Sequence, residues 1–401
     1  MIICEIEQCT GCSACLNICT HNAISMQKGT NGHLFPIVDE KICVQCNQCV
    51  NVCPNNSIPD FHTPISSYIA TAQNPQEAET STSSGIATVF SRYIVEDGGV
   101  VYGSCGDNCQ KIQHIRISNS DEVEKLKGSK YVQSSIGKSF CQVREDLKKG
   151  LSVLFIGTPC QVAGLNKFLR KGYDNLYTID LICHGVPSQQ ILNDALKAYL
   201  PDINLDEVTL KFRKKEKGKS LYGLFVDDKQ GKKLYRSVYP DNEYITGFLC
   251  GLYYRESCYQ CHYARPERVS DITVGDYWDR EKKIHIDNAN GGLSMLIVNT
   301  PAGQHLLELC QAKINDLPGN YSDFIKRNGQ LDHPLKRFPH YADFIKDYEE
   351  HGFLWASQNH LKEEKQRVRT AILKMRIKDC ILSMPMGNQV VRILRSIKQK
   401  K

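Results

Sequence analysis

The sequence predicts a multidomain α/β protein. We expect a small cysteine-rich module, then α/β domains with a partly parallel sheet, then a basic helical tail. Two identical cysteine runs occupy residues 9–54, units of buried strand, loop and helix repeat after residue 150, and Lys and Arg gather after residue 360. Because 401 residues exceed one ordinary hydrophobic core, we expect two or three domains.

The two cysteine runs share one spacing, in which two residues separate each of the first three cysteines and three residues separate the third from the fourth. This spacing is typical of bacterial two-cluster ferredoxins, in which the fourth cysteine of each run binds the other cluster. Structural zinc is the alternative, but zinc sites use separated cysteine pairs at looser spacings. We therefore expect two 4Fe-4S clusters, one held by Cys9, Cys12, Cys15 and Cys53, and one by Cys43, Cys46, Cys49 and Cys19.

The cysteine spacings and the hydropathy predict where in the cell the protein lies. Many of the 19 cysteines stand in metal-ligand spacings, and we find no secretory signal. No stretch approaches the roughly 18 apolar residues that a bilayer-spanning helix needs. We expect a cytoplasmic protein, soluble or peripheral to the inner face of the membrane.

The C-terminal segment carries the positive charge. Residues 361–401 hold twelve Lys or Arg against three acidic residues, within a chain of net charge +6. Apolar residues from Val368 to Met375 and from Val390 to Ile397 recur at helical spacing, and Pro385 and Gly387 separate the two helices expected. Such helices bind anionic membranes or pack on the protein body, and both alternatives stay open. Nucleic acid is not expected, because no aromatic residues interleave with the charges.

The pattern of apolar residues divides the chain. The cysteine-rich module covers 1–60, and 61–84 is expected to be a linker, because 72–84 is poor in large apolar residues. A domain over 85–150 begins with a helix that ends at Gly98-Gly99, followed by strands at 100–103 and 112–117. A second domain covers 151–345, and the helical tail covers 346–401.

Two strand-loop-helix units open the domain at 151–345. Buried strands at 152–156 and 176–182 each lead through a turn into a helix, and we expect them to be parallel. Cys160 and Cys183 follow these strands, at the sheet edge where α/β proteins build their sites. Our hypothesis is that they bind a third 4Fe-4S cluster with Cys258 and Cys261. The alternatives are inert packing, or a low-pKa nucleophile at Cys160 with His184 as its base.

Several separated motifs resemble the beta subunit of coenzyme F420 hydrogenase/dehydrogenase. They are GTPCQVAGL at 157–165, DLICHGVPS at 180–188, the cysteine pair at 258 and 261, DITVGDYW at 271–278, SSG at 83–85, GGVVYG at 98–103 and GSKYVQS at 128–134. The resemblance covers about residues 1–345. It implies FAD, iron-sulfur clusters, and an activity on coenzyme F420 or another conjugated electron acceptor.

The flavin contacts expected from these motifs come from two segments. A helix start at 84–85 offers N–H groups to a pyrophosphate, although ordinary capping explains it equally well. The expected contacts are Ser84, Gly85, Lys130, Tyr131, Gln133 and Ser134. Cys4, Cys105, Cys109, Cys141, Cys250, Cys310 and Cys380 are treated as structural.

Other polar residues receive simpler interpretations. His114 and Arg116 are expected to face solvent or the flavin edge rather than form an acid-base pair. Asp276 follows a buried strand and either lines the active cleft or belongs to a turn. The run Lys214 to Lys219 is expected to be an exposed connection between strands.

Two classes of function follow. In the first, the chain is an FAD-dependent oxidoreductase that receives electrons from a ferredoxin or a redox partner subunit and acts on a conjugated substrate. In the second, it is a non-catalytic electron-relay subunit of a larger complex. A substrate-sized cleft beside the flavin favours the first, and an exposed apolar patch on the ferredoxin module favours the second.

Overall fold

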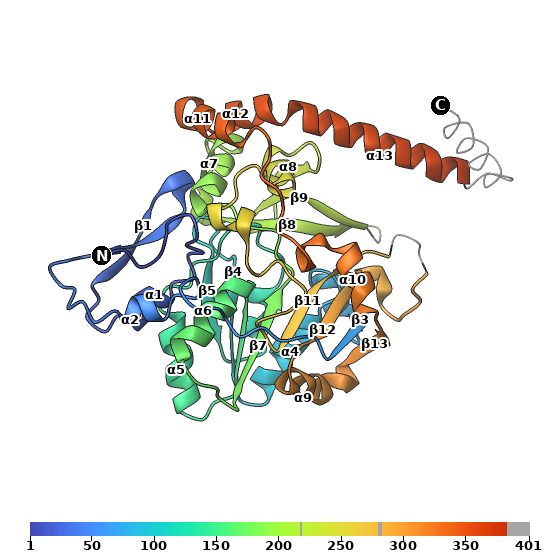
Figure 1. Ribbon diagram of the computed structural model, residues 1–401. Coiled ribbons are helices and arrows are strands. Elements are labelled where there is room, and N and C mark those ends of the chain that lie inside the picture. Colours follow the sequence, from blue (N-terminus) through green and yellow to red (C-terminus); the bar gives the residue numbers. More distant parts are fainter. Residues whose placement is uncertain (217–218, 280–282, 383–401) are drawn as a thin grey trace.

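An eight-stranded mixed sheet forms the centre of the computed structural model, which describes residues 1–216, 219–279 and 283–382 (Figure 1). Its strand order is β13-β3-β12-β11-β7-β6-β4-β5. The strands are β3 Ser66–Ala72, β4 Val100–Cys105, β5 Gln113–Ile117, β6 Val153–Gly157, β7 Leu176–Leu181, β11 Ile272–Tyr277, β12 Leu293–Val298 and β13 Ile314–Pro318.

The middle of this sheet is parallel. Strands β4, β6, β7 and β11 pair in parallel, whereas the strands on either side of them pair antiparallel. The apolar runs in β6 and β7 are buried because helices cover both faces of the sheet. The expected partly parallel sheet, with β6 and β7 as parallel neighbours, is therefore confirmed.

Helices pack on both faces of the sheet. One face packs against α4 Ile86–Glu96 and α9 Pro301–Cys310, and the other against α5 Ser139–Lys148 and α6 Pro159–Leu169. Helix α6 begins with a capping box, in which Thr158 and Gln161 exchange hydrogen bonds, and with Pro159 in its first turn. This rigid start fixes the position of Cys160 at the edge of the sheet.

A second core lies above the sheet in Figure 1. It joins a three-stranded antiparallel sheet to the helices around it. The strands are β8 Val208–Glu216, β9 Lys219–Asp228 and β10 Lys233–Val238, and the helices are α7 Gln189–Tyr199, α8 Glu243–Cys250, α11 Tyr341–His351 and α12 Phe353–His360. A shorter helix, α10 Tyr321–Arg327, packs beside β11 and β12.

The N-terminal module has two short helices and a hairpin, which are α1 Ala14–Ile18, β1 Ile24–Lys28, β2 Leu34–Val38 and α2 Gln48–Asn51. The hairpin lies between the two cysteine runs. The module packs on α5 and α6, and Asn17 donates to the Gly137 carbonyl at 2.8 Å. Gly164 in α6 permits a close approach, because a Cβ there would lie 2.9 Å from Cys12 Sγ.

The expected linker at 61–84 needs correction. Residues 66–72 form β3, which lies between β12 and β13, and residues 75–80 form α3, Pro75–Thr80. Small side chains such as Ala70 and Ala72 are fully buried there. The segment lacks large apolar residues because it packs closely between neighbouring strands. Strands from 85–150 and 151–345 share the same sheet, so no sheet boundary divides those two regions.

The expected tail at 346–401 needs correction, because its first part, in α11 and α12, packs in the second core. The part that extends away from the body is one long helix, α13 Lys362–Leu382 (Figure 1). Ion pairs from Lys365 to Glu243 and from Arg369 to Asp241, both 2.6 Å, hold its start. Further along, Leu373, Met375 and Ile377 are exposed. The second expected helix, after Pro385 and Gly387, lies outside the described residues. Among the helices described, none is long and apolar enough to cross a bilayer.

We predict that Gly164→Ala destabilises the docked module. Alanine favours a helix by about 1 kcal/mol, but the overlap with Cys12 must push the cysteine loop away from α6. We expect a lower melting temperature and a loss of iron, measured by calorimetry and iron analysis. Gly172→Ala is the matched control, because its Cβ would meet no atom within 4 Å. Equal melting temperatures and iron contents for both variants would contradict this interpretation.

Candidate redox site

The first expected cluster set converges in the structure. Cys9, Cys12 and Cys15 of the first run and Cys53 of the second line one small cavity. The fourth cysteine of the second run has therefore reached the loop of the first. Cys4, expected to be structural, lines the same cavity, and its thiol lies against those of Cys9 and Cys53.

The second set lies nearer to solvent. Cys43, Cys46 and Cys49 lie close to one another, and Cys19 packs in the same cluster as Cys49. Cys46 is exposed, and the Gln45 backbone N–H donates to Cys43 Sγ at 3.4 Å. The second set therefore forms the outer face of the module, while the first faces the body.

A larger cavity of about 580 Å³ opens at the carboxyl ends of the parallel strands. Cys160, Cys183, Cys258 and Cys261 all line it. Cys160 comes from the first turn of α6, Cys183 follows β7, and the other two lie in and just after the 3-10 turn Glu256–Gln260. The four dispersed cysteines of the third-cluster hypothesis are thus brought to one place.

The electrostatics of this set do not favour a nucleophile. Burial raises the pKa of Cys160 to about 12 and that of Cys183 to about 12. Burial also lowers the pKa of the proposed base, His184. A thiol with a raised pKa is not a reactive thiolate near neutral pH. The nucleophile alternative for Cys160 therefore has no support in the structure.

The spacing of the sulfurs also argues against zinc. A zinc ion bound at about 2.3 Å in a tetrahedron places its sulfurs roughly 3.8 Å apart. In the described part of the chain, no three cysteine sulfurs lie within 4.8 Å of one another. A group larger than one ion fits this spacing better, and a cube of four irons with thiolate ligands is such a group.

Five of the six expected flavin contacts line the same large cavity, namely Gly85, Lys130, Tyr131, Gln133 and Ser134. Ser84 does not line it. The Ser84 hydroxyl is fully buried and donates to the Ala70 carbonyl at 2.7 Å, next to Ser294 Oγ at 2.7 Å. Ser84 therefore joins the start of α4 to the sheet instead of facing the cavity.

Lys130 contributes a cation to the part of the cavity wall that contains the expected flavin contacts. Its ammonium donates to the carbonyls of Leu126 at 2.8 Å and Lys127 at 2.9 Å. Burial lowers the pKa of Lys130 to about 8. The side chain is held by neutral groups, so its charge is available to an anionic group in the cavity.

His114 and Arg116 have separate partners, which agrees with the expectation that they do not form an acid-base pair. His114 bonds to Ser134 Oγ at 2.9 Å and to the Ile156 carbonyl at 3.0 Å, and burial lowers its pKa to about 4. Arg116 forms an ion pair with Asp146 at 2.6 Å. His114 is therefore a neutral part of the cavity wall.

Several polar atoms in the cavity wall lack protein partners. They are buried and lie on different elements: Thr10 Oγ1, Ser104 Oγ, His184 Nδ1 and Asn328 Oδ1. Buried polar atoms in folded proteins are usually hydrogen-bonded. Together with a volume inside the range of about 300 to 1,000 Å³ typical of cofactor pockets, these atoms indicate a cavity built for a ligand with polar groups.

The other end of the cavity holds an aromatic and charged group. Arg213 forms an ion pair with Asp276 at 2.7 Å, and Tyr222 donates to the same carboxylate at 3.2 Å. The guanidinium of Arg213 lies 4.6 Å from the centre of the Tyr222 ring, and Trp278 packs nearby. Asp276 therefore lines the cleft, whereas Arg213 and Tyr222 were not foreseen.

The basic run at 214–219 differs from the expected exposed connection. Strands β8 and β9 extend through most of it, and Lys215 donates to the carbonyls of Ala78 at 2.5 Å and Ser83 at 2.6 Å. Lys215 therefore holds the loop that precedes α4. In the sequence, a lysine that anchors a loop cannot be distinguished from a solvent-exposed lysine in the same charged run, so the role of Lys215 is visible only in the folded structure.

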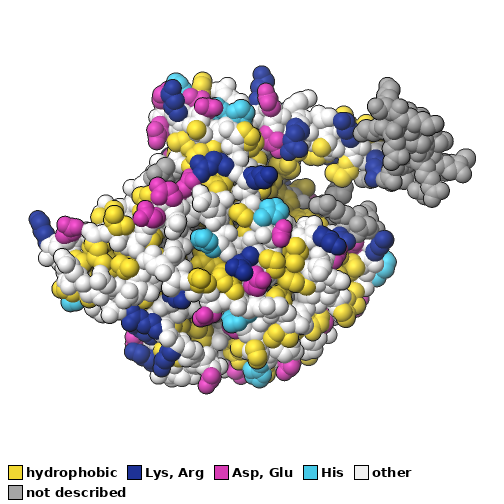
Figure 2. All heavy atoms as spheres, viewed as in Figure 1, with side chains coloured by type: hydrophobic (Ala, Val, Ile, Leu, Met, Phe, Trp, Pro, Cys, Tyr) yellow, Lys and Arg dark blue, Asp and Glu magenta, His cyan; other side chains and the backbone are white. Residues whose placement is uncertain are grey.

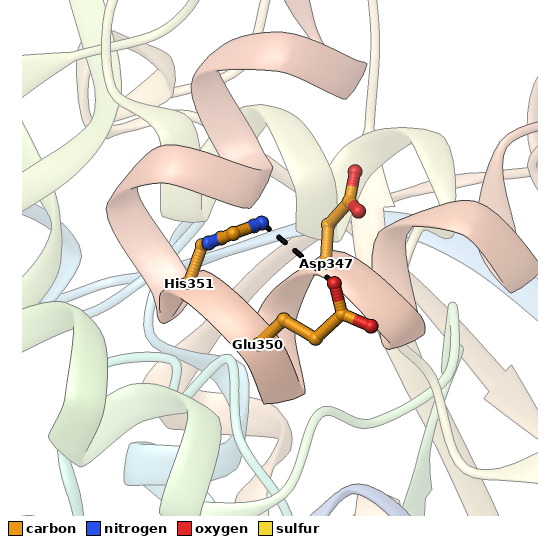
Figure 3. Close-up of side chains that lie close together, drawn as sticks. All are labelled: Asp347, Glu350 and His351. Carbon is orange, nitrogen blue, oxygen red and sulfur yellow. Dashed lines mark ion pairs between the residues drawn. The ribbon is translucent and has the colours of Figure 1, made fainter.

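A second group of possible metal ligands lies far from this cavity. Asp347, Glu350 and His351 stand on successive turns of α11 (Figure 3). His351 lies 3.7 Å from Glu350, whereas Asp347 pairs with His360 at 2.7 Å. The carboxylates and the imidazole already have partners and two of the three residues are exposed, so we assign this group no role.

Comparisons with known proteins agree with these features. Residues 150–315 match the family described as the C terminus of the coenzyme F420 hydrogenase/dehydrogenase beta subunit, and residues 8–57 match a 4Fe-4S dicluster domain. A coenzyme F420-dependent sulfite reductase from Methanocaldococcus jannaschii is 25% identical over 293 residues. That match covers 68% of this chain but 41% of the relative, so the chain spans less than half of the relative's length.

A solved chain of the F420-reducing [NiFe] hydrogenase complex from Methanosarcina barkeri is also similar. The match has a TM-score of 0.45 and 17% identity, and it covers 77% of this chain and 96% of that chain. The two matched segments contain all twelve cysteines of the three expected ligand sets. Residues 150–315 are therefore similar to the C-terminal region of the coenzyme F420 hydrogenase/dehydrogenase beta subunit family, and residues 8–57 form a 4Fe-4S dicluster domain, so the chain is an iron-sulfur protein related to that family.

Proposed function

We propose that this chain is an FAD- and iron-sulfur-dependent oxidoreductase. Its ferredoxin-type cysteines receive single electrons, and the set at Cys160, Cys183, Cys258 and Cys261 holds a third 4Fe-4S cluster on the way to the flavin. The substrate is coenzyme F420 or another conjugated organic molecule. When bound, a flavin supplies the step between one-electron carriers and two-electron hydride chemistry.

One observation carries this proposal. A single cavity contains both the four dispersed cysteines and five of the expected flavin contacts. Cofactors that exchange electrons must lie close together, and the residues that would hold these two already share one cavity. Gly85, in a left-handed conformation at φ 82°, lets the backbone turn sharply into α4 beside this cavity.

The residues at the aromatic end suit a flat conjugated substrate. Tyr131 stacks on Phe248 with ring centres 4.5 Å apart, and Tyr222 and Trp278 continue this aromatic wall. Aromatic faces bind planar rings through offset stacking. Arg213 and Asp276 neutralise each other, so they offer hydrogen bonds to a substrate without a net charge.

A specific observation also supports the relay alternative. Five large apolar side chains are exposed on the N-terminal module, namely Ile2, Ile6, Ile37, Ile42 and Val44, and Cys46 of the outer cysteine set is exposed as well. Figure 2 shows hydrophobic side chains on this lobe, at the left of the view. Contiguous exposed apolar surface usually marks a protein contact. We propose that a redox partner docks here. The oxidoreductase would pass electrons on to a substrate in the large cavity, whereas the relay subunit would exchange electrons only with protein partners.

We predict twelve iron atoms per chain, from three clusters of four. The double variant Cys160→Ser and Cys183→Ser should lose about four irons while the ferredoxin-type signal persists, because the other two ligand sets are untouched. Iron analysis and electron paramagnetic resonance on anaerobically prepared protein measure this. Cys141→Ser is the matched control, since Cys141 belongs to no ligand set. An unchanged iron content in the double variant would remove the third cluster.

We predict that FAD binding depends on pH through Lys130. Its pKa of about 8 means that the ammonium is charged below pH 8 and neutral above it. Affinity should therefore fall as pH rises through 8, and Lys130→Met should weaken binding roughly tenfold or more at pH 7, because hydrogen bonds to charged groups contribute about 1.5–3 kcal/mol. Calorimetric titration measures both effects. Lys125→Met, at an exposed lysine, should leave the affinity unchanged. The same pH profile in Lys130→Met would contradict the assignment.

The proposed activity is tested anaerobically. The protein is loaded with FAD and reduced with dithionite, and flavin absorbance is followed while coenzyme F420 or other conjugated acceptors are added. We expect rapid reoxidation by one of these acceptors. Failure to bind any flavin would exclude the enzyme. A bound flavin that is reoxidised only by protein partners would favour the relay.

We also propose that the tail contacts an anionic membrane. Beyond its anchored start, α13 exposes Leu373, Met375 and Ile377 among basic residues. Each Lys or Arg contributes about 1 kcal/mol near such a surface, so replacing Lys374, Arg376 and Lys378 with Gln should weaken vesicle binding roughly 100-fold. Sedimentation with phosphatidylglycerol vesicles measures this, and phosphatidylcholine vesicles are the control. Negligible binding by the unaltered chain would leave a helix that contacts only protein or solvent.

A further inference from the structure

Two arginines are almost completely buried, and they differ in their partners. Arg268, 1% exposed, forms an ion pair with Asp180 at 3.1 Å. Arg255, also 1% exposed, forms no ion pair with a carboxylate among the described residues. A buried cation is costly unless an opposite charge compensates it. The surroundings of Arg255 should therefore supply a negative charge in the working protein.

The contacts of Arg255 point to the source of that charge. Its guanidinium donates to the Cys9 carbonyl at 2.5 Å and to Cys9 Sγ at 3.5 Å. It also donates to the Leu34 carbonyl at 2.8 Å and to Gln133 Oε1 at 3.1 Å, and it stacks over Phe35 at 4.3 Å. Apart from Cys9 Sγ, these partners are neutral, and Cys9 belongs to the first cluster set.

A 4Fe-4S cluster held by four thiolates is an anion, and its reduction adds one more negative charge. Its reduction potential depends on net charge, on hydrogen bonds to the sulfurs and on solvent exposure. Burial disfavours the added negative charge and so lowers the potential. A nearby cation that donates to a ligand sulfur stabilises the reduced state and raises the potential.

The two ferredoxin-type sets differ in this respect. Cys9, Cys12, Cys15 and Cys53 are all buried, and Arg255 donates to one of their sulfurs. In the outer set, Cys46 is exposed, and within the described residues no Lys or Arg side chain donates to a sulfur of that set. Without Arg255, burial alone would make the inner cluster the harder one to reduce.

We propose that Arg255 is a positioning residue that raises the reduction potential of the inner cluster, so that it accepts electrons arriving from the outer one. In this step one electron leaves the outer cluster and reduces the inner one, with no bond broken. An external one-electron donor restores the outer cluster. The direction is inward, because Cys12 contacts Gly164 of α6, the helix that carries Cys160. The change in potential rests on the dicluster domain, the inward direction rests also on the proposed cluster at Cys160, and neither rests on the flavin or the substrate.

Gln133 provides an independent way to change the same charge. It accepts from Arg255 and donates through Nε2 to the Thr10 carbonyl at 2.9 Å. Gln133→Glu places a carboxylate of the same shape against the guanidinium. The new ion pair would cancel much of the positive charge that acts on Cys9, while every cysteine and Arg255 itself are kept.

The test is an anaerobic redox titration of the full chain, followed by electron paramagnetic resonance. In Arg255→Gln, we expect the equilibrium constant for reducing one cluster to fall at least tenfold, a shift of about 59 mV for one electron. The other midpoint potentials should move less, because Arg255 donates a hydrogen bond only to Cys9 Sγ, although its charge also acts on Cys160. Gln133→Glu should move the same midpoint in the same direction. Arg170→Gln is the matched control, because Arg170 is an exposed arginine that bonds to Gln48 of the module, and it should move none.

The redox titration can fail or succeed independently of the tests for flavin binding and activity. Wild-type midpoint potentials in both Arg255→Gln and Gln133→Glu, with iron content intact, would overturn the proposal even if the flavin chemistry is correct. If Arg255→Gln fails to bind iron, the titration of Gln133→Glu decides alone. A shift of one midpoint supports the proposal even if no flavin binds.

Discussion

The contact between the Cys9–Cys12 loop and the body determines where every redox group would lie. Gly164 lets Cys12 approach α6, and Arg255 ties the Cys9 backbone to the chain just ahead of Cys258. Asn17 and Gln133 add hydrogen bonds across the same boundary. Four elements from different parts of the sequence are thus fixed around one loop. A shift of this loop would change the spacing between the buried ferredoxin-type set and the cysteines of the large cavity.

Much of the architecture could be predicted from the sequence because its signals are local. The cysteine spacing identified the N-terminal module, and the apolar runs at 152–156 and 176–182 identified adjacent parallel strands. Because parallel strands present their carboxyl ends at one edge, the sequence also predicts that Cys160 and Cys183 lie near each other. The turn after β7 is equally local, since Ser188 caps α7 by accepting from the Ile191 N–H at 3.2 Å.

The sequence could not reveal features that depend on distant partners. The sequence of residues 66–72 predicts part of a linker, whereas the structure has a strand there, because small residues are typical both of loops and of tightly packed strands. Ser84 was expected at the flavin, yet its hydroxyl bonds to the sheet. Arg255, Arg213 and Lys215 have the same local pattern as surface cations, and their burial depends on residues far away in the chain. Charged residues in the core are rare, so sequence patterns assign them to the surface.

Strand β3 also has a consequence for how the protein is made. It needs β12 and β13 as neighbours, and Ser67 Oγ donates to the Gly319 carbonyl across 252 residues. At about 5–20 residues per second, a ribosome needs roughly 13 to 50 s to synthesise that interval. For most of this time β3 has neither neighbour, and contacts so distant in sequence also form slowly. The N-terminal cysteines also leave the ribosome well before Arg255 and Cys258. Iron can therefore reach these cysteines before the surface on which their module docks has been synthesised.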